Sequence, residues 1–137
     1  MKFRDLSSTL LRKLGYRNEG HEGIVTPVHE STRFVLRYGD LEVGALQLQD
    51  GVWEFRYTPA FLQQSDVLPL VDFPLPGPVF TAESLWPFFM ARIPSVEQPK
   101  VREAIDREGL DEHSDVELLR RFGKRTIANP FVLQEAS

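Results

Sequence analysis

The residues best suited to acid–base or metal chemistry in this chain are its three histidines and the carboxylates beside them. His21 and His29 are each followed by a glutamate. The third histidine belongs to an acidic cluster, which comprises Asp111, Glu112, His113 and Asp115. Imidazole and carboxylate groups can bind zinc or transfer protons, but the spacing here differs from HExxH. The cluster also precedes a predicted helix, and negative charge near the N-terminus of a helix stabilises that helix. We therefore interpret the first two histidines as solvated loop residues and predict neither a metal nor a cofactor.

Motifs that would identify an enzyme are missing from the sequence. It contains no GxxxxGK[ST] or GxGxxG phosphate loop, no GxSxG nucleophile elbow, and no HRD or DFG motif of a kinase. It has no cysteine, which excludes disulfides and thiolate metal sites and fits a reducing cytoplasm. We therefore predict a cytoplasmic protein that is not an enzyme.

Charge and hydropathy restrict the partners further. The net charge of −4 differs from the basic character of a dedicated nucleic-acid binder. One basic run exists, Arg120-Arg121 with Lys124-Arg125, and its first two residues lie in the last turn of a predicted helix, where cations complement the helix dipole. No stretch approaches the roughly 20 apolar residues that span a bilayer. We predict no direct contact with nucleic acid or membrane.

The most distinctive segment is apolar: residues 83–94 read ESLWPFFMARIP. On a helix Leu85, Phe89 and Ile93 share one face, and Phe88 falls on another side with Arg92. Two interpretations stay open. The bulky side chains can all be core, which is the commoner case, or part of this helix can be a partner surface. Because aromatic residues and arginine dominate binding hot spots, the candidate partner-binding residues are Trp86, Pro87, Phe88, Phe89 and Arg92.

Periodicity along the rest of the chain predicts an α+β fold, a small antiparallel sheet with C-terminal helices packed beside it. Alternating residues predict strands over 33–38, 41–49 and 52–57, and Asp50-Gly51 is typical of a hairpin turn. Proline and capping signals predict helices that start at Pro59, at Pro99 and after Ser114.

Connecting segments and boundaries complete the predicted organisation. Residues 68–71 are interpreted as an apolar edge segment, 73–79 as a loop, and 126–134 as an extended return to the sheet or core. An amphipathic helix is predicted over 6–14. We divide the chain into an N-terminal helix-and-loop arm, residues 1–30, and one domain, residues 31–137.

The stretch VGALQLQDGVWEFRYTPAFL resembles the opening of the HipA family of serine/threonine kinase toxins. Further family motifs follow in order over residues 34–123, matched by Leu68-Pro69-Leu70, by Pro87-Phe88-Phe89 with Ile93-Pro94, and by Leu118-Leu119 with Phe122-Gly123. The chain departs from the family pattern after Pro94, where Ser95-Val96-Glu97 stands. It departs again at residues 124–128, which replace an acidic-glycine-alanine stretch.

This resemblance implies the fold of the N-terminal subdomain of these kinases without their ATP-binding body. A subdomain made as a separate protein resembles HipS, the antitoxin of the HipBST systems, which binds the kinase HipT alongside the DNA-binding HipB. The implied function is an antitoxin that neutralises a HipA- or HipT-type kinase by protein–protein contact. Two alternatives stay open: an orphan interaction module that serves another partner, and a small enzyme with an unrecognised site.

Overall fold

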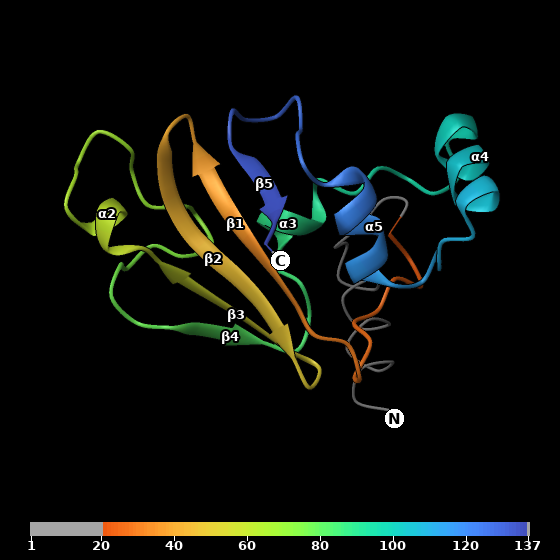
Figure 1. Cartoon of the computed structure of the whole chain (residues 1–137), viewed down its shortest axis with the longest axis horizontal. Coiled ribbons are helices and arrows are strands. Elements are labelled where there is room, and N and C mark those ends of the chain that lie inside the picture. Colours follow the sequence, from red (N-terminus) through yellow and green to blue (C-terminus); the bar gives the residue numbers. More distant parts are fainter. Residues whose placement is uncertain (1–20, 137) are drawn as a thin grey trace, which may run out of the picture.

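A five-stranded antiparallel sheet forms the centre of the computed structural model, which describes residues 21–136 (Figure 1). The strand order is β4-β3-β2-β1-β5, and every neighbouring pair is antiparallel. The strands are β1 (Thr32–Tyr38), β2 (Leu41–Gln49), β3 (Val52–Tyr57), β4 (Phe80–Ala82) and β5 (Val132–Glu135). The predicted meander is therefore confirmed as the inner three strands, and the fold class is α+β.

Four helices of the described chain connect or flank these strands. They are α2 (Pro59–Leu62), α3 (Pro87–Met90), α4 (Pro99–Glu108) and α5 (Asp115–Phe122). In Figure 1, α4 lies at the end of the molecule away from α2, and α5 lies between α4 and the sheet. An ion pair joins α4 to α5, since Arg121 Nε lies 2.8 Å from Glu108 Oε1. The helix predicted at residues 6–14 lies outside the described residues.

Local chemistry explains several of these elements. Asp50 and Gly51 both have positive φ, 52° and 78°, as a tight turn between β2 and β3 requires. Ser114 Oγ accepts a hydrogen bond from the Glu117 amide at 3.2 Å and so caps α5. Glu117 does not complete a capping box with Ser114, because its carboxylate accepts from the Asp111 amide instead. Gly109, with φ of 67°, ends α4 as a left-handed cap.

Aromatic side chains from the sheet and the following loops form the core. Phe55 of β3 stacks on Phe73 at a centroid distance of 4.2 Å. Tyr57 on the same strand donates to the Phe73 carbonyl oxygen at 2.7 Å and accepts from the Leu70 amide at 2.8 Å. Burial raises the pKa of the Tyr57 phenol. Residues 70–73 are thereby attached to the sheet by a side chain rather than by strand pairing.

Two local predictions are wrong, and one strand was missed. The helix expected within residues 83–94 is only the single turn of α3, because Pro87 opens it and the chain leaves helical geometry before Pro94. Residues 68–71 form no strand, because the Leu70 amide bonds to Tyr57. The strand β4 was not predicted: its three residues are defined by their pairing with β3, which no local pattern reveals.

Candidate functional site

An apolar groove of about 640 Å³ lies beside the start of α3. One wall is the segment of residues 66–72, and the other combines Pro87 and Phe88 of α3 with Tyr38 at the end of β1 and Phe131 just before β5. Two aromatic contacts join this second wall: Phe131 lies 5.3 Å from Tyr38 and 5.7 Å from Phe88, measured between ring centroids. The groove is therefore built from four stretches of chain that are distant in sequence.

Large apolar side chains are exposed along this groove. Leu68 is 74% exposed and Val71 is 93% exposed, and Tyr38 is also exposed. Exposed apolar side chains that gather around a concave surface are typical of a protein- or ligand-binding site. Asp66 and Asp72 are the carboxylates among its lining residues.

The groove is held in shape by hydrogen bonds that involve its lining residues. Gln64 accepts from the Val67 amide at 2.8 Å and donates to the Val67 carbonyl oxygen at 3.0 Å, which closes the turn that leads into the groove. Asp72 Oδ2 accepts from the Phe88 amide at 2.8 Å and so connects the two walls. A site held in this way needs little reorganisation when a partner binds.

The structure separates the five predicted site residues into two groups. Pro87 and Phe88 line the groove, and the half-buried Trp86 lies next to them with its ring 4.8 Å from Phe73, edge to face. Phe89 is fully buried and Arg92 is 3% exposed. The expectation that Phe88 and Arg92 form a free side of a helix is therefore wrong for Arg92, because the chain after α5 covers it.

Arg92 is a structural residue that supports the groove from inside. Its guanidinium lies 5.5 Å from the centre of the Phe88 ring, within cation–π range. Its other contacts are hydrogen bonds to the chain that follows α5. Burial lowers the pKa of Arg92 to about 10, because it penalises the charged form.

The profile of one known protein family matches most of the residues that the structure describes. That family is the HipA N-terminal domain, and its profile covers residues 35–128, more than half of the chain. The chain belongs to the HipA N-terminal domain family. Curated proteins give no match. Nearly all of the groove lies within the part that corresponds to the HipA N-terminal domain, with Phe131 just beyond it.

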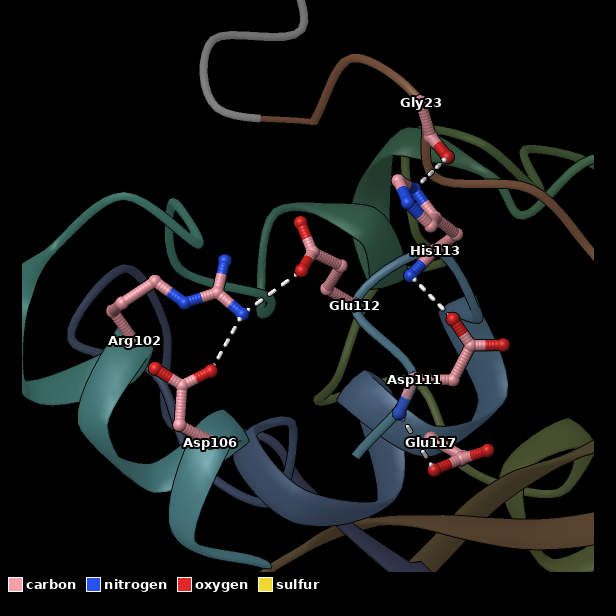
Figure 2. Close-up of polar contacts among 7 residues, drawn as sticks. All are labelled: Gly23, Arg102, Asp106, Asp111, Glu112, His113 and Glu117. Atoms are coloured by element: carbon pink, nitrogen blue, oxygen red, sulfur yellow. Dashed lines mark hydrogen bonds and ion pairs between the residues drawn. The ribbon is translucent and has the colours of Figure 1, made fainter. Parts of the chain in front are cut away.

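The histidine and carboxylate cluster of this HipA N-terminal domain is engaged in structural contacts. Figure 2 shows Arg102 of α4 bridging Asp106 and Glu112, at 3.1 Å and 2.9 Å. His113 Nδ1 lies 3.1 Å from the Gly23 carbonyl oxygen, and the His113 amide donates to Asp111 (Figure 2). No group of three potential ligands that could hold a metal occurs within residues 21–136.

The segment before β1 is more firmly attached than its sequence indicates. His21 is half-buried, with Nε2 2.5 Å from the Ile93 carbonyl oxygen, so the prediction of a solvated residue is wrong for His21, while His29 is exposed. Thr26 is buried and donates to Asp115 Oδ2 at 2.5 Å. Trp53 Nε1 donates to the same carboxylate oxygen at 3.2 Å. These contacts attach residues 21–26 to α5 and to the centre of the sheet.

Sequence reasoning missed most of the groove. The run at residues 68–71 carried a signal in its composition, since three apolar residues stand beside a proline. The exposure of Leu68 and Val71 came only from the structure. Tyr38 and Phe131 carried no such signal, because only the pairing of β1 with β5 brings them together.

None of the helices within the described residues is long and apolar enough to cross a membrane.

Proposed function

We propose that this HipA N-terminal domain is an antitoxin that binds and neutralises a HipA- or HipT-type kinase by protein–protein contact in the cytoplasm. The observation that carries the proposal is the preformed apolar groove beside Phe88 in a domain of this family. The domain would act by occupying a surface of the kinase and not by chemistry of its own. The proposed complex includes a HipB-type DNA-binding protein as a third member.

The groove has the physical properties of a protein-docking surface. Burying one exposed leucine or valine side chain stabilises a complex by about 1.5–3 kcal/mol. The groove offers two such side chains, Leu68 and Val71, which lie on either side of the buried Leu70 in the sequence. Phe88 adds an aromatic side chain, the type enriched in hot spots. The hydrogen bonds that Gln64 accepts from the Val67 amide and Asp72 accepts from the Phe88 amide fix the walls in advance, which lowers the entropy cost of binding.

Co-expression with the HipA-type kinase of the same genome tests the proposal. The wild-type chain should restore growth in cells that express the kinase and should co-purify with it. Val71→Asp should abolish both effects while the melting temperature stays unchanged, because this side chain is 93% exposed. Val28→Asp is the matched control, since Val28 is an exposed valine that does not line the groove.

Different failures have different meanings. If the wild-type chain neither binds the kinase nor restores growth, the antitoxin proposal is wrong. If it binds the kinase equally well with Val71→Asp, the groove is not the docking surface. Calorimetry with Mg-ATP should detect no specific binding to the isolated chain, and a micromolar dissociation constant would support the enzyme alternative instead.

A further inference from the structure

The loop that follows α5 is held in place by the buried guanidinium of Arg92. We call residues 123–131 the Arg92 loop. Arg92 Nη1 donates to the carbonyl oxygens of Gly123 and Lys124 at 3.0 and 3.2 Å. Nη2 donates to Asn129 Oδ1 at 3.1 Å and to the Phe131 carbonyl oxygen at 2.8 Å. One side chain therefore fixes both ends of the loop.

Further hydrogen bonds define the tip of the Arg92 loop. Thr126 and Asn129 form an isolated antiparallel bridge, and Thr126 Oγ1 accepts from the Ala128 amide at 3.2 Å. Asn129 Oδ1 also accepts from the Phe131 amide at 3.1 Å. Burying a guanidinium carries a large desolvation cost, which ordinary surface connections do not require. The structure therefore maintains one particular conformation of this loop.

That conformation displays an apolar side chain flanked by cations. Ile127, at the tip, is fully exposed, so it contributes nothing to the core. Lys124 and Arg125 are exposed and form no ion pair with any residue of the range 21–136. The two cations that precede them in the basic run are paired, Arg120 with Glu135 and Arg121 with Glu108.

We propose that the Arg92 loop is a second docking element, in which Ile127 enters an apolar pocket with an acidic rim on the kinase that covers the groove. The identity of this partner rests on the proposed function. Phe131 makes the two surfaces continuous, because its carbonyl oxygen is bound by Arg92 and its ring lines the groove. The apolar tip requires an apolar pocket, and Lys124 and Arg125, which pair with no carboxylate of residues 21–136, are complementary to carboxylates around it.

A protein fits this element better than a nucleic acid does. An isoleucine at the tip of the loop has no complement on a phosphate backbone. Two of the four cations in the basic run are already neutralised by glutamates, and the whole chain carries a net charge of −4. The β-branched isoleucine also has few rotamers to lose, so fixing it in a pocket costs little entropy.

Binding measurements on the full chain and the purified kinase of the same genome test the inference. Ile127→Asp should weaken binding by about tenfold or more, as expected for an interface anchor, with an unchanged melting temperature. The double variant Lys124→Glu/Arg125→Glu should weaken binding and reduce its dependence on salt. Val28→Asp and Lys100→Glu, which change an exposed valine and an exposed lysine elsewhere, should bind as the wild-type chain does.

The outcomes separate this inference from the proposed function. If Val71→Asp abolishes binding while Ile127→Asp binds like the wild-type chain, the second docking element is refuted and the groove proposal stands. If the wild-type chain does not bind the kinase, both fail together. If a short DNA duplex binds the wild-type chain and loses binding with Lys124→Glu/Arg125→Glu, the loop serves nucleic acid and the inference is overturned.

Discussion

The Nη2 atom of Arg92 and the carbonyl oxygen of Phe131 lie 2.8 Å apart, and this hydrogen bond connects the turn after α3 to the residue that leads into β5. The same guanidinium lies against the Phe88 ring in the wall of the groove. Arg92 is thus common to the groove and to the loop that displays Ile127. A change at Arg92 should affect both surfaces at once, although its own side chain is buried.

Arg92→Ala should lower the free energy of unfolding by about 3 kcal/mol, because it leaves buried acceptors in the Arg92 loop without a donor. Arg92→Lys should recover only part of this loss, since a single ammonium group cannot span the same acceptors. Urea denaturation measures both effects. Arg107→Ala is the control, because Arg107 is exposed on α4 and should change stability by about 0.5 kcal/mol or less. Equal effects of Arg92→Ala and Arg107→Ala would contradict the structural role.

Features that depend on neighbouring residues were predictable from the sequence. Asp50-Gly51 specifies its turn because both residues tolerate positive φ, and Ser114 caps α5 through its own side chain. Gly109 ends α4 for a similar local reason. These signals need no knowledge of the rest of the fold, and the turn at Asp50-Gly51 and the helix start after Ser114 were predicted correctly.

Features that depend on distant residues were not predictable. The helical periodicity of residues 83–94 placed Arg92 on a free side, but acceptors more than thirty residues later enclose it. The groove likewise requires Phe88 to meet Phe131, which depends on the return of β5 to the sheet. The sequence identified Pro87 and Phe88 as partner-binding candidates, while their surroundings came only from the tertiary structure.

Asp115→Ala should be strongly destabilising, although the sequence indicated only a helix-capping charge. The substitution removes the carboxylate that accepts from the buried Thr26 hydroxyl. It also removes one of the two acceptors of the Trp53 indole, whose other acceptor is Thr26 Oγ1 at 3.0 Å. The expected loss in the free energy of unfolding is about 3 kcal/mol. Thermal and urea denaturation followed by tryptophan fluorescence measure it. Asp106→Ala, at an exposed carboxylate paired with Arg102, should change stability by about 0.5 kcal/mol or less. A similarly small effect of Asp115→Ala would refute the role of this network.

Acid should weaken the contacts of α4 with the residues around α5. A hydrogen bond from Arg121 lowers the pKa of Glu108 below its ordinary value of 4.5, and one from Arg102 lowers that of Glu112. Groups with depressed pKa values stabilise the fold above their unfolded pKa. This contribution disappears as the pH falls through the lower folded pKa. The free energy of unfolding should therefore fall as the pH drops below about 4.5.

The double variant Glu108→Gln/Glu112→Gln checks this pH dependence. It should be less stable than the wild-type chain at neutral pH and should approach it in acid, so the slope of stability against pH becomes smaller. High salt should reduce the difference, because both ion pairs are at the surface. An unchanged slope in the double variant would show that other carboxylates cause the acid dependence.

The adjacent residues Phe88 and Phe89 provide a matched pair for separating binding from folding. Phe89 is fully buried against Phe55 at a centroid distance of 5.8 Å, so Phe89→Ala should cost about 3–5 kcal/mol of stability. Phe88 is half-buried and lines the groove, so Phe88→Ala should cost less stability. It should weaken binding to the HipA-type kinase of the same genome by about tenfold or more.

Thermal melts and binding measurements on both variants give the result. Phe88→Leu, which keeps an apolar side chain in the wall, should restore most of the stability but only part of the binding. If Phe88→Ala melts as early as Phe89→Ala, then Phe88 is a core residue and the groove must bind its partner through Leu68 and Val71. If Phe88→Ala keeps both its stability and its affinity for the kinase, this wall of the groove does not contact the partner.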